Sequence, residues 1–422
     1  MILDDSQDKS RSVRVLYIDS AGPFGGAGRS LFESVSELVS KHAVQAFFIA
    51  TAGTIVPYYR KVATDILTVG GIPKFDNTRL GRYRGVRWLI LLRELAYVPV
   101  FAIGLARARA RFGAVDIVHA NEILELFPLL MAKLVFRAQA VLHVRSPQSQ
   151  AHSSFRNRFI YFLINRYIDS IIAIDAGVAR TLPDNLKCHV VNNAFAHAQY
   201  LHCTDNALQD KLRAAPLAAI RVGFVGNLYR SKGIVETVKA FDLLRSRGVD
   251  AVLLVLGGAT RKTDSLFSRI LKQLGFEDNV DNLVMSMIRD LHLESRVVML
   301  GPSDDIGEFY RSIDLLCFAT WLDGPGRPVF EAAFFGRPSL VAVRSPTPDT
   351  LIHRVTGIAI DTPDPTSICK AIEELVSDRE GLIKMGVSAQ GLAVKNNSPS
   401  VNASRIISIY RDLFVNTNRR DL

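Results

Sequence analysis

Cysteines are few in this sequence, and their spacing does not pair any of them. The chain has four, with no Cys-x-x-Cys among them: Cys188, Cys203, Cys317 and Cys369. This pattern argues against a zinc site or a disulfide framework and fits a reducing compartment. The acidic residues also lack a metal-binding pattern, because no Asp-x-Asp pair occurs in the chain. We therefore expect no catalytic metal ion and no bound cofactor.

Long apolar runs are absent as well. The first 12 residues are largely polar and hold no apolar leader segment. The longest uncharged apolar run, from Leu95 to Ala106, contains Pro99 and is shorter than the roughly 20 residues that span a bilayer. We therefore expect a cytoplasmic protein that is either soluble or peripheral on the inner face of the membrane.

The composition that remains is that of an ordinary globular chain of 422 residues, 48% hydrophobic and 22% charged. That length is natural for two domains of roughly 200 residues each. Short apolar runs alternate with helical patterns twice along the chain, which predicts two doubly wound α/β units. The polar stretch from Tyr200 to Pro216 separates the two series, and we place the domain boundary there, after residue 205.

Positive charge is concentrated in residues 79–111. The net charge is +10, and this segment sets eight arginines against one acid, Glu94, with Trp88 and several leucines between them. A basic, aromatic-bearing element of this kind suits an anionic membrane surface. No nucleic-acid module accompanies it, so we expect no nucleic-acid partner. A core-packed helix with a solvated basic face stays equally open.

The first apolar run, Val13 to Asp19, leads into a glycine loop and then into helical spacing from Arg29 to Ser40. A strand, a glycine loop and a helix in this order can hold phosphate groups on backbone N–H groups. The glycine spacing differs from the Gly-x-Gly-x-x-Gly fingerprint of dinucleotide sites, so an oxidoreductase is disfavoured. The glycines of the loop are Gly22, Gly25, Gly26 and Gly28.

Two later strands are expected to end in polar residues. The first ends in His119 and Asn121, and the second ends in His143 and Arg145. Ligands of open parallel sheets bind beyond the carboxyl ends of the strands, so these residues are candidates for chemistry. A histidine that is merely hydrogen-bonded in the fold is the open alternative.

The second series begins with a strand at Ile220 to Val225 and a glycine-containing loop that ends in Lys232. The lysine stands at the start of a helix, whose dipole repels a cation unless an anion lies between them. A solvated lysine is disfavoured for that reason, and a phosphate group would supply the anion.

The stretch from Thr320 to Val343 carries two acids. Asp323 lies in a Gly/Pro-rich loop, and Glu331 lies in a helix that we expect to begin near Pro328 and to end at Gly336. The start of this helix offers backbone N–H groups to a ligand, and Glu331 can accept hydrogen bonds from its hydroxyl groups. The alternative for Glu331 is a solvated acid on a surface helix.

This stretch resembles the retaining GT-B glycosyltransferases of family four, the glycosyl transferases group 1. The resemblance implies that Asp323 touches the donor sugar, that Gly324, Gly326 and Arg327 line the donor, and that Glu331 binds the ribose hydroxyls of the nucleotide. The family has Glu at the first acid, so Asp323 is a departure. The matching residues are Asp323, Gly324, Pro325, Gly326, Glu331, Ala332, Gly336, Pro338 and Val341.

The likeness is weaker toward the N-terminus. It implies that His143 is the family's histidine near the donor sugar and that Lys232 holds the donor diphosphate. Where the family has an arginine before that lysine, this chain has Asn227, and Arg230 could supply the missing charge. The donor-binding residues implied in these earlier regions are Gly25, Gly26, Asn227, Arg230 and Lys232.

The resemblance implies two facing Rossmann-like domains with a cleft between them. Residues 1–205 would form the acceptor side, residues 206–400 would bind the nucleotide sugar, and a helix in residues 401–422 would cross back to the first domain. The implied activity is retaining transfer of a sugar from a nucleotide-diphosphate donor to a glycan or lipid-linked acceptor. Membrane binding by the basic segment 79–111 would favour a lipid-linked acceptor, as in cell-surface polysaccharide biosynthesis. A sugar-nucleotide epimerase or hydrolase, and a non-catalytic nucleotide-sugar-binding protein, are the alternatives.

Overall fold

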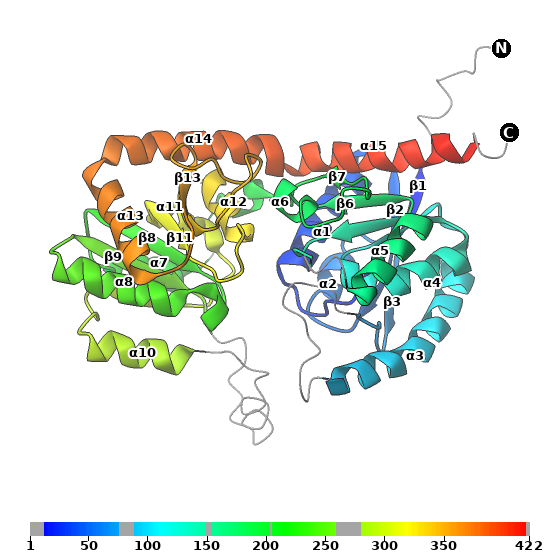
Figure 1. The fold of residues 1–422 in the computed structure, drawn as a ribbon, viewed down its shortest axis with the longest axis horizontal. Coiled ribbons are helices and arrows are strands. Elements are labelled where there is room, and N and C mark those ends of the chain that lie inside the picture. Colours follow the sequence, from blue (N-terminus) through cyan, green and yellow to red (C-terminus); the bar gives the residue numbers. More distant parts are fainter. Residues whose placement is uncertain (1–11, 76–87, 149–153, 203–204, 259–279, 419–422) are drawn as a thin grey trace, which may run out of the picture. The chain divides into compact units, whose positions relative to one another are not determined.

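The computed structural model describes residues 12–75, 88–148, 154–202, 205–258 and 280–418. Within these ranges the chain forms two α/β units (Figure 1). The first unit runs to Phe195 and resumes at Asn396, and the second unit runs from Ala196 to Lys395. The polar stretch that suggested a linker contains helix α7 (Asn206–Ala214), which packs in the second unit. Its Lys211 Nζ donates to the carbonyl of Leu300 at 2.6 Å.

The first unit is built on a seven-stranded parallel sheet. The strand order is β3-β2-β1-β4-β5-β6-β7. Nearly every residue of its central strands is buried, because helices cover both faces of the sheet. The strands are β1 (Val13–Asp19), β2 (Val44–Thr51), β3 (Asp65–Val69), β4 (Ile117–Ala120), β5 (Gln139–Val144), β6 (Ser170–Ala173) and β7 (His189–Val190).

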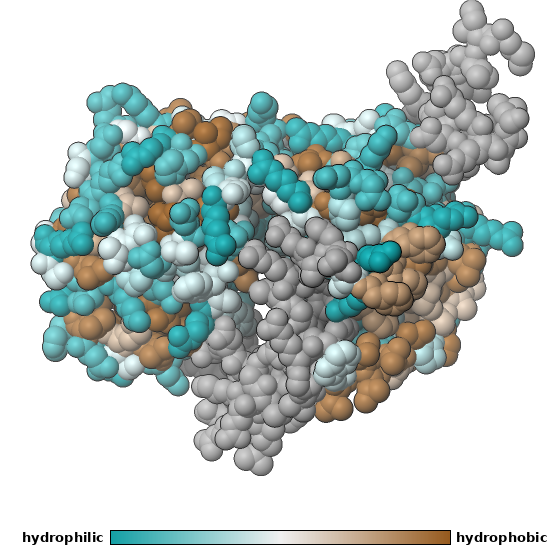
Figure 2. All heavy atoms as spheres, in the orientation of Figure 1, coloured by the Kyte–Doolittle hydropathy of each residue, from teal (hydrophilic) through white to brown (hydrophobic). Residues whose placement is uncertain are grey.

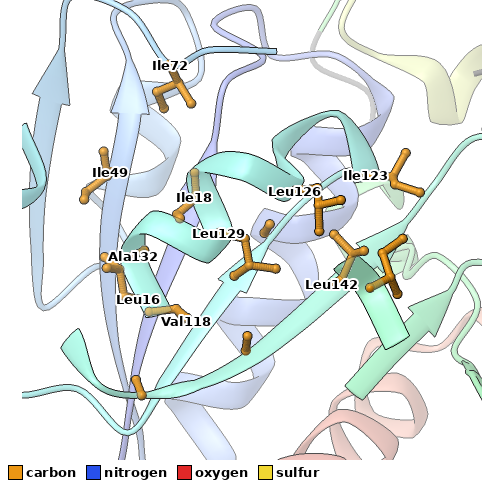
Figure 3. Close-up of a cluster of buried hydrophobic side chains, with 14 of the residues drawn as sticks. Leu16, Ile18, Ile49, Ile72, Val118, Ile123, Leu126, Leu129, Ala132 and Leu142 are labelled. Atoms are coloured by element: carbon orange, nitrogen blue, oxygen red, sulfur yellow. The ribbon is translucent and has the colours of Figure 1, made fainter. Parts of the chain in front are cut away.

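Two apolar clusters hold the helices of the first unit on its sheet. On one face, helices α3, α4 and α5 pack on side chains such as Leu16 and Val118, and Figure 3 shows the part of this cluster beneath α4. On the other face, α1 and α15 pack on alternate residues of the same strands, such as Val15 and Tyr17. The helices of this unit are α1 (Gly26–Lys41), α2 (Val56–Tyr59), α3 (Leu89–Phe112), η2 (Ile123–Glu125), α4 (Leu126–Phe136), α5 (Phe155–Tyr167), α6 (Ala176–Ala179) and α15 (Pro399–Asn418).

Helix α3 corrects one expectation from the sequence. It continues through Pro99 over 24 residues, and by length and composition it is apolar enough to cross a membrane. The sequence, whose longest uncharged apolar run is Leu95 to Ala106, predicts no segment long enough to do so. Its Phe101, Leu105 and Ala108 are nevertheless fully buried in the cluster on the sheet. In this fold one face of the helix therefore covers the sheet, while only 22% of its apolar window is buried.

The second unit is built on a six-stranded parallel sheet with the order β10-β9-β8-β11-β12-β13. Its strands are β8 (Ile220–Val225), β9 (Ala251–Leu256), β10 (Val297–Gly301), β11 (Leu315–Phe318), β12 (Ser339–Ala342) and β13 (Gly357–Ile360). Besides α7, its helices are η3 (His197–Tyr200), η4 (Arg230–Lys232), α8 (Ile234–Ser246), α10 (Asp281–Asp290), α11 (Ile306–Ser312), α12 (Arg327–Phe334), α13 (Pro365–Ser377) and α14 (Arg379–Asn397).

Candidate functional site

The strand order of the second sheet reverses between β8 and β11, which are neighbours although six described elements separate them along the chain. In open parallel sheets, ligands bind at the carboxyl ends of the strands at such a reversal. The loop after β8 leads to Lys232, and the loop after β11 leads to α12. The two loops are joined by hydrogen bonds to the carbonyl of Ser231, from Trp321 N at 2.9 Å and from Thr320 Oγ1 at 3.0 Å.

Gly233 fixes how closely the first loop approaches β11. Its φ is +76°, and a Cβ atom built on it would lie 1.7 Å from the carbonyl oxygen of Ala319. Only glycine fits both the backbone conformation and this contact. The Lys-Gly pair read from the sequence thus has a structural reason, because the glycine sets the position of Lys232 beside the end of β11.

Lys232 is partly buried, and its Nζ lies 5.6 Å from the centre of the Phe318 ring. Burial lowers the pKa of this ammonium group. In the part of the chain that the structure describes, no carboxylate lies within ion-pair distance of it. An anionic ligand would stabilise the charge of Lys232 in this position. This observation supports the interpretation, made from the helix dipole, that Lys232 holds a phosphate group.

Helix α12 begins at the same aromatic ring. Its N-cap is Gly326, no side chain caps it, and its first turn holds no acid. A Cβ atom on Gly326 would lie 2.5 Å from Cζ of Phe318, so this glycine is required for the loop to pass the ring. Lys232 and the uncapped start of α12 thus flank Phe318, and together they form a cradle for an anion.

Glu331 is only 4% exposed, so the alternative of a solvated surface acid is wrong. Its Oε1 accepts a hydrogen bond from Arg327 Nε at 2.5 Å, and its Oε2 accepts one from Tyr310 Oη at 2.9 Å. Each carboxylate oxygen can accept a second hydrogen bond. The group is therefore held in one orientation by the protein and keeps the capacity to bind hydroxyl groups.

Asp323 adopts a left-handed backbone conformation, with φ of +52°. Asp tolerates this region better than most residues with a Cβ, which gives the departure from the family's Glu a physical reason. Its Oδ1 accepts a hydrogen bond from Arg344 N at 3.0 Å and so ties the loop to the segment after β12. Gly324, beside it, has open space where a Cβ would lie.

The other donor-side candidates of this unit lie on the loop after β8. Asn227 and Arg230 are both exposed, and Arg230 begins the short helix η4. The preceding Gly226 has φ of +137°, and Gly257 packs against its carbonyl so closely that a Cβ there would lie 1.9 Å away. The structure therefore places these two side chains on the same loop as Lys232, on its solvent side.

The first unit has an equivalent reversal between β1 and β4. Gly25 is the N-cap of α1, which begins at Gly26 without a side-chain cap or an acid in its first turn. Gly28 packs against Ile55, because a Cβ on it would lie 2.1 Å from Ile55 Cδ1. The predicted order of strand, glycine loop and helix is present, but the uncapped helix begins at Gly26, three residues before Arg29, so Gly26 and Gly28 lie in the helix and not in the loop.

His143 lies inside the first unit, 4% exposed. Its Nδ1 lies 3.4 Å from His119 Nε2 and 3.4 Å from Arg145 Nη2, and its Nε2 has no partner among the described residues. Burial and the charge of Arg145 lower the pKa of His143 well below its usual value, so the ring is neutral. His119 in turn contacts Tyr410 Oη through Nδ1 at 2.6 Å.

The sequence did not predict the hydrogen-bond network around Arg145. The guanidinium donates to Asn121 Oδ1 at 2.7 Å and to Asn193 Oδ1 at 2.5 Å. Glu122 accepts from Ser146 Oγ at 2.8 Å and from Arg145 N at 3.3 Å. Burial lowers the pKa of Arg145 to about 10, so it stays charged at neutral pH. The signal that could have found Glu122 is its place two residues after the end of the buried strand β4.

Two further buried acids are Asp19, the last residue of β1, and Glu125, the last residue of η2. Asp19 accepts from the hydroxyl of Tyr59 and from Ala21 N, and Glu125 accepts from Ser20 N at 2.7 Å. Burial, together with the charge of Asp19, raises the pKa of Glu125 to about 8.

Among the residues that the structure describes, no group of three or more His, Cys, Asp or Glu side chains is arranged to hold a metal ion.

Comparison with known proteins assigns the second unit to a protein family. Residues 210–392 match the family described as glycosyl transferases group 1, and this range contains the loops after β8 and β11. The second unit is a glycosyl transferases group 1 domain. The match covers Lys232, Asp323 and Glu331, the residues on which the sequence resemblance rested.

Relatives of the group 1 domain act in several pathways. The D-inositol 3-phosphate glycosyltransferase of Corynebacterium kroppenstedtii is 27% identical over 220 residues, which cover 51% of this chain and 46% of that protein. The capsular polysaccharide biosynthesis glycosyltransferase CapM of Staphylococcus aureus is 25% identical over 174 residues, 41% of each chain. The chain thus matches less than half the length of these curated relatives.

The fold likeness extends beyond the group 1 domain. The Anabaena protein HepE, solved in complex with UDP and glucose, superposes with a TM-score of 0.69 at 19% identity, over 94% of this chain and 98% of that one. The sucrose-phosphate synthase of Thermosynechococcus elongatus gives a TM-score of 0.69 at 16% identity, over 96% and 99%. The predicted GT-B class, with two Rossmann-like α/β units, is confirmed.

Proposed function

We propose that the protein is a retaining glycosyltransferase that takes its sugar from a nucleotide-diphosphate donor. The observation that carries the proposal is the cradle around Phe318, in which the ammonium of Lys232 and the uncapped start of α12 lie together. A diphosphate supplies the anion that this arrangement lacks. Glu331, held by Tyr310 and Arg327, takes the ribose hydroxyls, and Asp323 and the loop after it take the sugar.

The chemical task is to stabilise the negative charge that develops on the leaving diphosphate. Lys232, backbone N–H groups at the start of α12 and the exposed Arg230 supply positive potential at that point. Group 1 enzymes are thought to let the acceptor attack from the face that the diphosphate leaves, so the acceptor's proton passes to the leaving phosphate. In this scheme the second unit binds the donor, and the first unit, with Gly25, Gly26 and His143, serves the acceptor and the donor sugar.

The acceptor side of the proposal is a glycan or a lipid-linked glycan, made for the cell surface. The name of CapM, a capsular polysaccharide enzyme, supports this choice. The basic segment 79–111 supports a cytoplasmic protein at an anionic membrane, although Arg79, Arg82, Arg84 and Arg87 lie outside the described residues. Flotation with anionic vesicles tests that part, and replacement of Arg82, Arg84 and Arg87 by Glu should lower the bound fraction in a salt-sensitive way.

A thermal-shift screen over nucleotide sugars tests donor binding, because a ligand of the folded state raises the melting temperature by mass action. We expect a shift with at least one nucleoside diphosphate and with its sugar conjugate. Lys232→Met should abolish most of the shift. The matched control is Lys239→Met, which removes an exposed lysine from the same helix region and should leave the shift unchanged. No shift with any nucleotide would refute the proposal.

Product analysis separates transfer from the alternatives on the same scaffold. With the matched donor, a transferase forms a new glycoside only when an acceptor sugar or lipid-linked sugar is added. An epimerase or hydrolase consumes the nucleotide sugar without an acceptor. A binding protein gives the thermal shift but no product under either condition.

A further inference from the structure

Helices α3, α4 and α5 form one continuous layer on the first unit's sheet. All three bury side chains in the same cluster. The guanidinium of Arg109 lies 5.8 Å from the ring centre of Phe136, which joins α3 to α4. Lys133 Nζ donates to the carbonyl of Tyr167 at 2.8 Å, which joins α4 to the end of α5. The outward faces of these helices are therefore parts of one surface.

Helix α5 is apolar on its outward face as well as on its buried face. Phe155, Phe159 and Phe162 are 85%, 47% and 59% exposed. Their spacing of four and three residues places them on a single stripe. Ile160 and Ile164, on the opposite side of the helix, are buried in the core. Packing on the sheet therefore leaves the phenylalanine stripe unexplained.

Helix α3 presents the same arrangement. Leu92, Leu95 and Ile103 are 63%, 50% and 56% exposed, and Trp88 at the helix start is 58% exposed. Figure 2 shows apolar surface over α3 and over α5 on this side of the first unit. Contiguous exposed apolar surface of this kind marks an interaction site in a folded protein.

The charges on this layer are of one sign. Between residues 126 and 168, which include α4 and α5, the sequence contains no Asp or Glu. Arg158 and Arg166 are exposed on α5 and lie beside or within the phenylalanine stripe by helical spacing. The single acid of α3, Glu94, is buried and accepts from Lys74 N at 2.7 Å. The layer thus combines apolar side chains with positive charge and offers no exposed acid of its own helices.

We infer that α3 and α5 together form a docking surface for an anionic lipid bilayer. The phenylalanines of α5 enter the boundary between headgroups and acyl chains, and Arg158 and Arg166 meet lipid phosphates. The inference rests on the membrane part of the proposed function and extends it to α5, which the basic segment 79–111 does not include. A second copy of the chain fits less well, because a two-fold contact would bring like charges of α5 together.

Binding to vesicles tests the role of α5 with the full chain and no nucleotide sugar. The probes are vesicles of phosphatidylcholine alone and vesicles with phosphatidylglycerol added, at low and high salt. We expect flotation only with the anionic vesicles. Phe155→Ser combined with Phe159→Ser, and separately Arg158→Glu combined with Arg166→Glu, should each weaken binding at least about tenfold.

Matched controls come from exposed residues of the second unit. Ile383→Ser with Val387→Ser removes two apolar side chains that are 64% and 65% exposed and also four residues apart. Lys239→Glu with Lys370→Glu reverses two exposed charges. Both control variants should float like the wild type.

Three outcomes would overturn the inference. The α5 variants could float like the wild type while Leu92→Ser with Ile103→Ser on α3 loses binding, which would limit the surface to α3 and leave the proposed function intact. The wild type could fail to bind anionic vesicles at all. It could also form a dimer in solution that the Phe155 and Phe159 changes dissociate, which would make the stripe a contact between copies of the chain.

Discussion

The hydroxyl of Tyr310 donates a hydrogen bond to Oε2 of Glu331 at 2.9 Å. Arg327 Nε holds the other carboxylate oxygen from one turn earlier on α12. The carboxylate is thus oriented from two sides before any ligand arrives. If Glu331 binds ribose, the two partners reduce the entropy lost when the nucleotide binds.

We predict that Glu331→Ala weakens nucleoside diphosphate binding by a few kcal/mol, since each charge-assisted hydrogen bond contributes about 1.5–3 kcal/mol. The change also leaves Arg327 buried without its carboxylate, so the melting temperature of the free protein should fall. Glu331→Gln keeps one acceptor oxygen and serves as the better-folded companion. Calorimetry with the ribonucleotide and its 2′-deoxy form gives the decisive readout, because the preference for ribose should shrink in both variants.

Tyr310→Phe removes only the hydroxyl that orients Glu331. We expect a smaller loss of affinity, about 0.5–1.5 kcal/mol, and a reduced preference for ribose over 2′-deoxyribose. Unchanged affinity for every nucleoside diphosphate would show that the hydrogen bond from Tyr310 serves the fold alone.

We predict that Asp323→Asn lowers sugar transfer strongly and leaves nucleoside diphosphate affinity nearly unchanged, because the ribose and phosphate contacts lie elsewhere. Asn tolerates the left-handed backbone of this position as Asp does, so the loop should keep its shape. Asp323→Glu should also impair turnover, because its longer side chain crowds the sugar. Steady-state kinetics on the matched donor decides the point, and full activity of the Asn variant would remove Asp323 from the donor contacts.

Gly233 and Gly248 allow a controlled test of the contact with β11. Both have positive φ, +76° and +71°, but a Cβ on Gly248 would have nothing within 4 Å. Gly248→Ala should cost about 1–2 kcal/mol of stability through its backbone conformation. Gly233→Ala should cost more, and it should also reduce nucleotide binding by displacing Lys232. Equal losses of stability in chemical denaturation would mean that the loop moves away from Ala319 without penalty.

The buried histidines predict how stability depends on pH. Burial lowers the pKa of His119 to about 3 and that of His143 well below its usual value. On acidification below about pH 6.5 the unfolded chain binds protons that the folded chain does not, so the free energy of unfolding falls by up to about 1.4 kcal/mol per histidine and pH unit. Urea denaturation at pH 7, 6 and 5 measures this slope, which should be shallower in His143→Gln. A variant with the wild-type slope would contradict the assignment.

Local patterns predicted the parts of the site that depend on local structure. The strand, glycine loop and helix around Gly25, and the Lys-Gly pair at Lys232, follow from turn and helix-start chemistry within a few residues. The helix of Glu331 was predicted for the same reason. The contact of Tyr310 with Glu331 could not be predicted in this way, because 21 residues and a strand separate the two.

Two other features depend on tertiary packing. Asp323, whose backbone is left-handed, accepts a hydrogen bond from Arg344 N, which is 21 residues away. The network of Arg145 joins ends of three chain segments through Asn121 and Asn193.

Helix α7 was not predicted from the sequence, because its polar surface residues outweigh its two buried ones, Leu208 and Leu212. Its N-cap, Asp205, was the available signal.

The first unit draws its core from both ends of the sequence, because α15 supplies Ile406, Tyr410 and Leu413 to the cluster over β1. During synthesis, residues 1–195 leave the ribosome with α1 on that face of the sheet but without the side chains of α15. The second unit is complete once Lys395 has emerged and can fold before the first is finished. Termination between Lys395 and α15 would therefore yield a chain with a complete group 1 domain and a first unit whose sheet is partly uncovered and prone to aggregate.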